Sequence, residues 1–184
     1  SVVVVTPEQV YNEFSSGTPE ATAIRRFMKM FYDRRTSAAD APKYLLLFGD
    51  GAHDNRQLSS AWKAIDMKNF LLTYQTRFSL GGNWSFDGEH HETYVTDDYF
   101  GFLDDSEGAQ IGTCHLRLGI GRFPVRTLSQ ARAAVNKVIN YIDNPSYGAW
   151  KNNLCFIGDD GSAIDSYRTD HMDYAYILAK SVEQ

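Results

Sequence analysis

Short apolar runs alternate with helical patterns along this chain, and this alternation limits the possible folds more than any other feature. Apolar runs typical of buried strands occupy residues 2–5, 43–48, 116–121 and 154–158. Helical patterns follow these runs: a short turn from Pro7, a helix beyond Thr18 and Pro19, a helix opened by Thr127 and Gln130, and a helix from about Asp170. Strands that alternate with helices predict an α/β fold with a largely parallel sheet.

The first long helical pattern carries apolar residues at helical spacing, and we expect Thr18 to cap it, with Pro19 at its first position. The helix opened by Thr127 carries a second apolar stripe and is expected to end at Asn144 and Pro145. No strand follows the last helix, although a parallel strand needs neighbours. We therefore expect this chain to be a piece of a larger protein, cut at Gln184 inside a further βα repeat.

Residues 52–88 show no sustained period, which predicts a loop-rich segment with one short helix or hairpin. Residues 93–95 and 99–102 are expected to be short extended pieces. Aromatic residues are frequent in the loop-rich segment. We expect them to form a small core, and the less favoured alternative is that they line a peptide groove. They are Trp62, Phe70, Tyr74, Phe78, Trp84 and Phe86.

Composition excludes several classes of protein. The 184 residues contain 18 Lys and Arg against 23 Asp and Glu, for a net charge of -5, and no basic cluster suited to nucleic acid. The longest purely apolar run is residues 44–48, which is too short to span a membrane. Cys114 and Cys155 form neither a disulfide framework nor a Cys-x-x-Cys site.

Four sequence blocks, taken in order, resemble the gingipain family of cysteine peptidases, and within it the sortases of the type IX secretion system. The blocks cover nearly the whole chain. They are residues 6–17 with 23–29, residues 44–51 (Tyr-Leu-Leu-Leu-Phe-Gly-Asp-Gly), residues 96–101 with 119–125 (Thr-Asp-Asp-Tyr-Phe-Gly and Gly-Ile-Gly-Arg-Phe-Pro-Val), and residues 154–161 leading to 170–172.

The resemblance implies a caspase-like, gingipain-like fold, a three-layer sandwich with a mostly parallel sheet. Residues 1–148 would form the non-catalytic first subdomain, and residues 149–184 the first strand and helix of the catalytic one. The resemblance also places the catalytic His and Cys beyond Gln184, so no catalytic residue is expected within this chain. Cys155 is expected to be an inert core thiol, and Cys114 is not expected to pair with His115, because adjacent strand residues point to opposite faces.

Family resemblance further suggests calcium ligands. Asp50 is the best match, Asp104, Asp105 and Glu107 match more loosely, and His171 lies where a second calcium site would be. Calcium prefers several carboxylate and carbonyl oxygens from irregular loops. A solvated acidic turn and a local hydrogen bond of His171 remain open as alternatives, and Arg117 stands where the family tends to have an acidic ligand. His90 and His91 lack a metal-binding partner at helical spacing and are expected in a surface loop.

The implied function is that of a fragment of an endopeptidase or sortase that processes the C-terminal sorting domains of type IX secreted proteins. The fragment would supply scaffold and part of the cleft, and would be inactive alone. Expected partners are proteins carrying such domains and other type IX components, at the outer face of the outer membrane of a Bacteroidetes-type bacterium. No cofactor is expected for catalysis. The alternative is a non-catalytic interaction module of the same fold.

Overall fold

The computed structural model describes residues 1–76, 94–108, 113–143, 148–158 and 171–182 of the chain. Contacts divide the chain into two compact units, Ser1–Ile139 and Asn140–Gln184. The predicted subdomain boundary, after residue 148, falls inside the second unit. Assignment of residues 1–148 and 149–184 to two subdomains stays a prediction.

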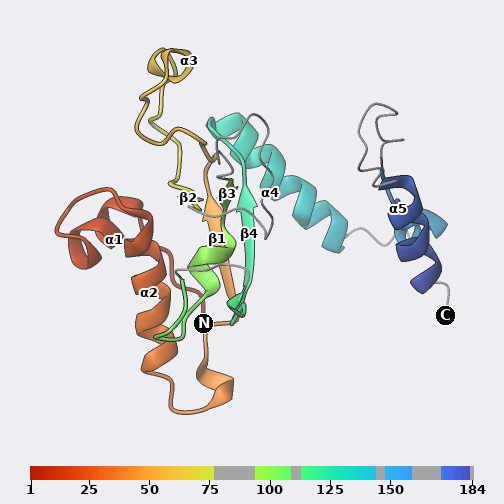
Figure 1. Ribbon diagram of the computed structural model, residues 1–184, viewed down its shortest axis with the longest axis horizontal. Helices are drawn as coiled ribbons and strands as arrows, with labels where there is room; N and C mark the ends of the chain where they lie inside the picture. The colour runs from red at the N-terminus through yellow and green to blue at the C-terminus, as the bar shows by residue number, and fades with distance from the viewer. Residues whose placement is uncertain (77–93, 109–112, 144–147, 159–170, 183–184) are drawn as a thin grey trace, which may run out of the picture. The chain divides into compact units, whose positions relative to one another are not determined.

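A parallel pair of strands lies at the centre of the first unit. Strand β1 (Tyr44–Phe48) runs alongside β4 (Gly119–Phe123), in a register that starts with Tyr44 opposite Gly119 (Figure 1). The predicted strand at 43–48 is confirmed, and β4 lies slightly later in the chain than the predicted 116–121. Parallel pairing of strands so far apart in sequence requires a crossover connection, as in other α/β proteins.

Helices α1 (Pro7–Phe14) and α2 (Ala21–Asp33) lie on one side of this sheet (Figure 1). A capping box starts α1: Thr6 Oγ1 accepts a hydrogen bond from the Gln9 amide, and Gln9 Oε1 accepts one from the Thr6 amide. The predicted cap of α2 by Thr18 is wrong, because Glu20 is the N-cap and makes no side-chain capping bond. Thr18 instead belongs to the turn after α1, where its carbonyl accepts a bond from Ser15 Oγ.

The main core forms where α1 and α2 meet β1. Its buried members are Val10, Tyr11, Ala23, Ile24, Leu47, Tyr99 and Phe100. Alternation along β1 directs Leu47, 4% exposed, into this core and leaves Tyr44 82% exposed. The prediction of a fully buried strand at 43–48 is therefore wrong for the described residues, because Tyr44, Leu46 and Phe48, on the face opposite Leu47, are 82%, 52% and 45% exposed.

Between β1 and β4 the chain makes short elements. These are α3 (Ser60–Lys63), β2 (Tyr74–Gln75), which pairs antiparallel with β3 (Val95–Thr96), and the 3-10 helix η2 (Asp98–Gly101). The prediction of one short helix or hairpin in 52–88 is confirmed for the described part. Residues 77–93, with Phe78, Trp84, Phe86, His90 and His91, lie outside the described residues.

Helix η2 stands where an extended segment was expected at 99–102, so that prediction is wrong. The amide of Phe100 donates to the carbonyl of Asp97 at 3.0 Å, which tightens the chain into a 3-10 turn. This turn places the consecutive residues Tyr99 and Phe100 together in the core, whereas a strand would direct them to opposite faces.

The runs at 2–5 and 154–158 are not strands in the structure. Val2 and Ile157 are each 89% exposed, and the described strands pair only with one another. An apolar run forms a strand only where a neighbouring strand completes its backbone hydrogen bonds. Composition therefore identified apolar runs, but it could not show whether each run has a neighbouring strand to pair with.

Helix α4 (Leu128–Asp143) follows β4 and continues into the second unit. The predicted capping box is present, since Thr127 Oγ1 accepts from the Gln130 amide and Gln130 Oε1 accepts from the Thr127 amide. The second unit also contains the 3-10 helix η4 (Ala149–Asn152) and helix α5 (His171–Ser181), which begins next to its predicted start. None of the described helices combines the length and apolarity that crossing a bilayer requires.

Candidate functional site

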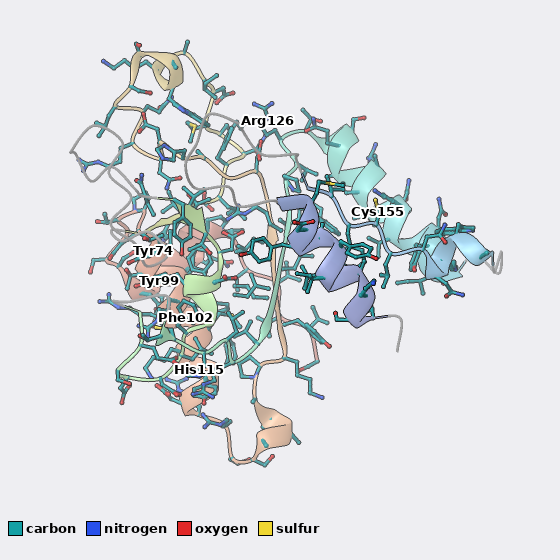
Figure 2. The ribbon with its side chains drawn as sticks, turned by 45° about the vertical axis from the view of Figure 1, so that its right-hand side comes forward. Tyr74, Tyr99, Phe102, His115, Arg126 and Cys155 are labelled. Carbon is teal, nitrogen blue, oxygen red and sulfur yellow. The ribbon has the colours of Figure 1, made fainter. Side chains whose placement is uncertain are left out.

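The carboxyl ends of β1 and β4 form the first candidate site. Pairing continues past both strands, because Gly49 N donates to Phe123 O at 3.1 Å and Asp50 N donates to Val125 O at 3.2 Å. The Asp50 carboxylate accepts a bond from Gly51 N, and its second oxygen lies 3.4 Å from Arg126 Nε. Asp50 thus lies at the strand end, as predicted, with a cationic partner (Arg126 is labelled in Figure 2).

Arg122, on β4, connects the segments that meet at this edge. Its guanidinium forms a two-pronged bond with the Asp97 carboxylate, Nε to Oδ2 and Nη2 to Oδ1, both at 2.7 Å. It also donates to four backbone carbonyls, those of Gly49, Asp50, Leu71 and Leu72, at 3.0 to 3.3 Å. One side chain therefore holds the end of β1, the segment before β2 and the segment after β3. We call this group of contacts the Arg122 junction.

The acidic turn at residues 102–108 is the second candidate site. Glu107 Oε2 accepts from Asp104 N at 3.1 Å, and Glu107 Oε1 accepts from His115 N at 2.9 Å. The Asp104 carboxylate pairs with Arg117 and accepts from the hydroxyl of Tyr32. These bonds fold the turn back on itself and tie it to the segment before β4.

Cationic side chains set the electrostatics of this turn. The Arg117 guanidinium beside Asp104 holds the pKa of that carboxyl below its usual range. Lys29 Nζ lies 2.8 Å from Asp105 and lowers the pKa of Asp105 in the same way. Both carboxylates are therefore ionised at neutral pH and already paired with cations of the chain.

The predicted calcium ligands of the turn do not fit a calcium site as they are arranged. Calcium takes about six to eight oxygen ligands, with carboxylates facing the ion. Here Asp104 and Asp105 face Arg117 and Lys29, and Glu107 uses both its oxygens on backbone amides. Among the described residues, no group of three or more His, Cys, Asp and Glu side chains could hold a metal ion.

The remaining predicted ligands lie apart from this turn. Within the described residues, the Asp50 carboxylate contacts Gly51 N and Arg126, and neither residue belongs to the turn. His171 opens α5, and its side chain is outside the described part of the chain. Calcium binding at Asp50 or near His171 stays a prediction.

The two cysteines lie in different surroundings. Cys114 is partly buried, and its sulfur accepts a bond from Gly108 N at 3.3 Å, whereas the His115 side chain is 77% exposed and lies near Glu107. Cys155 belongs to the second unit and is exposed, so the prediction of a buried core thiol is wrong for the described chain (Figure 2). Its exposure follows from the missing strand pairing at 154–158.

Comparison with known proteins identifies the family. The family model described as peptidase family C25 matches residues 1–184, the whole chain. The chain belongs to peptidase family C25. This is the gingipain family, so the resemblance carried by the four blocks is confirmed.

Among solved structures, this C25 chain is similar to the dimeric latent PorU from Porphyromonas gingivalis. The two share 46% sequence identity with a TM-score of 0.66 over 83% of this chain, and the match covers 14% of the PorU chain. A search of the curated proteins found no match. The caspase-like gingipain fold expected from the resemblance is confirmed.

The structure explains what several of the C25 blocks do in this chain. Arg122 comes from the block at 119–125, Asp97 from the block at 96–101, and the carbonyls of Gly49 and Asp50 from the block at 44–51. These blocks, distant in sequence, therefore meet at the Arg122 junction. Sequence reasoning missed Arg122, although a charged residue inside an apolar strand was a usable signal, since such a residue needs partners.

Proposed function

We propose that this chain is part of a gingipain-family cysteine endopeptidase that works as a sortase, removing the C-terminal sorting domains of type IX secreted proteins at the bacterial cell surface. The observation that carries the proposal is the 46% identity to PorU over 83% of the chain, within a C25 match that spans residues 1–184. The chain spans only 14% of that PorU chain, so activity is assigned to the whole parent protein. Other components of the type IX system are its proposed partners.

The described residues support a scaffold role beside the cleft. In α/β proteins, ligands commonly bind outside the carboxyl ends of the parallel strands. In this chain that edge is held by the Arg122 junction, with the Arg122 side chain only 12% exposed. A rigid edge of this kind would fix the loops that line one side of a substrate cleft.

The chemical step is proposed to use a Cys and a His that lie outside residues 1–184. The Cys thiolate attacks the scissile carbonyl carbon, the protonated His gives its proton to the leaving amine, and water then hydrolyses the thioester. Backbone amides would stabilise the oxyanion. Cys114 and Cys155 have no part in this step.

A cleavage assay with cysteine variants tests the proposal. The complete parent protein is incubated with a protein that carries a C-terminal sorting domain, and the products are identified by mass spectrometry. We expect cleavage that iodoacetamide abolishes, unchanged cleavage by Cys114→Ser and Cys155→Ser, and no cleavage by residues 1–184 alone.

Each deviation from this result has a distinct meaning. Loss of cleavage in Cys114→Ser or Cys155→Ser, with the fold intact, would contradict the placement of the nucleophile outside this chain. Hydrolysis by residues 1–184 alone would contradict it as well. A complete parent that binds the substrate protein without cleaving it would support the alternative, a non-catalytic interaction module.

A further inference from the structure

The guanidinium of Arg25 lies among the backbone carbonyls of the acidic turn. Arg25 comes from α2, and its Nε donates to Phe102 O at 2.5 Å. Its Nη2 donates to Asp104 O at 3.0 Å and to Glu107 O at 2.9 Å. Three carbonyl oxygens from one short loop therefore converge on a single positive charge.

An aromatic pair holds this cation in place. The Arg25 guanidinium lies 5.6 Å from the centroid of the Tyr99 ring, and the ring of Tyr99 stacks on that of Tyr74 at 3.7 Å. Tyr74 and Tyr99 lie side by side in Figure 2. The Tyr99 hydroxyl lies 3.2 Å from Thr22 Oγ1, also on α2, which fixes the ring against the helix that carries Arg25.

The backbone of the turn closes around the same group. Gly108 adopts a φ of +110°, and a Cβ at this position would lie 3.2 Å from Tyr99 Cε2 and 3.4 Å from Arg25 Cζ. A residue with a side chain would be strained in this conformation and crowded against both groups. The turn therefore wraps closely around the guanidinium.

Lys29 and Arg117 complete the charge balance of the turn. One helical turn after Arg25, Lys29 donates to Leu103 O at 2.9 Å and pairs with Asp105, while Arg117 pairs with Asp104. Carbonyl and carboxylate oxygens are the ligands that calcium prefers. In this turn, side-chain cations satisfy both kinds of ligand.

We infer that Arg25 is an internal cation that orders the turn at residues 102–108, so that this turn folds without a divalent metal ion. The inference concerns the turn alone and does not depend on the proposed peptidase function. It accounts for the poor fit of the turn to calcium. The carboxylates of Asp104 and Asp105 and the turn carbonyls already have cationic partners, and the Glu107 carboxylate accepts from two backbone amides.

Hydrogen exchange of the backbone amides of Asp104 and Glu107 tests the inference in the complete parent protein. These amides donate within the turn, to Glu107 Oε2 and Asp104 O at 3.1 Å, so they report on its opening. In the wild type we expect equal exchange rates in EDTA and in millimolar calcium. Arg25→Ala should speed exchange by about ten- to a hundredfold, because three hydrogen bonds from a charged donor are lost.

Two further variants make the test specific. Arg26→Ala is the matched control, since this neighbouring side chain on α2 donates to Phe14 O at 2.9 Å, away from the turn, and its loss should leave exchange of the turn amides nearly unchanged. Arg25→Lys keeps the charge but lacks the planar fork, so an intermediate increase is expected, and it remains informative if Arg25→Ala does not fold. Slower exchange at Asp104 and Glu107 on addition of calcium to the wild type would overturn the inference. Unchanged exchange in both Arg25 variants would overturn it as well.

Discussion

Removal of the Arg122 side chain should destabilise the carboxyl end of the β1–β4 sheet more than removal of any other charged side chain at this edge. The Arg122 and Asp97 side chains are 12% and 23% exposed, and their two bonds are each 2.7 Å long. Arg122→Ala leaves the Asp97 carboxylate without its cation and four backbone carbonyls without this donor. Both losses act on the same edge of the sheet.

The expected magnitude follows from burial. Removing one partner of a fully buried ion pair costs about 3–5 kcal/mol. Because Asp97 remains partly accessible to water, we expect about 2–4 kcal/mol for Arg122→Ala. Arg122→Lys retains the charge but cannot make the two-pronged bond or reach all the carbonyls, so about 1–2 kcal/mol is expected.

Native-state hydrogen exchange measures this loss locally, at the amides of Gly49, Asp50 and Leu71. These amides cross the junction, to Phe123 O, Val125 O and Asp50 O at 3.1, 3.2 and 2.8 Å. Arg126→Ala is the matched control, because the Arg126 side chain is 51% exposed and its Nε lies 3.4 Å from Asp50 Oδ2, a contact worth less than about 1 kcal/mol. If Arg122→Ala costs no more than Arg126→Ala, the central role given to Arg122 is wrong.

Three other predictions follow from local geometry. Thr127→Ala removes the acceptor for the first turn of α4 and should cost about 1 kcal/mol, measured by amide exchange in that turn. Gly49→Ala places a Cβ 2.9 Å from Leu71 Cγ and should cost about 1–3 kcal/mol in thermal or denaturant unfolding, whereas Gly121→Ala, with nothing within 4 Å, should be nearly neutral. Burial raises the pKa of Tyr11 from 10.0 to about 12, so the unfolded chain ionises first and stability should fall as pH rises through this interval. Tyrosinate absorbance and unfolding at alkaline pH, compared with Tyr11→Phe, check this, and equal pH dependence of the two proteins would contradict it.

Periodicity and the capping box at Thr127 predicted helices correctly, because both depend on residues close in sequence, whereas the cap expected at Thr18 was wrong. The stripe of α2 and the capping box of α4 are local, and the structure contains both. The strand predictions were only partly correct. Residues 44–48 and 2–5 are both apolar runs, yet only the former have a strand beside them. Pairing depends on residues far away in the chain, so composition alone could not separate the two runs.

The charged residues that organise the two candidate sites were the hardest to foresee, and the reason is physical. Sequence reasoning began from the acidic residues and asked which external cation they would bind. In the structure, Arg25 and Arg122 supply the cation from within the chain, and most of their bonds go to backbone carbonyls, which every residue carries. Because every residue has a backbone carbonyl, the sequence does not show where several carbonyl oxygens will converge on one cation. The arginines themselves do leave a mark, since Arg25 directly follows the buried Ile24 and Arg122 lies within a strand of the sheet. A charged side chain in such a position destabilises the folded protein by roughly several kcal/mol unless it finds partners. When an acidic turn is interpreted, an arginine among core residues should therefore be considered as its cation before a metal ion.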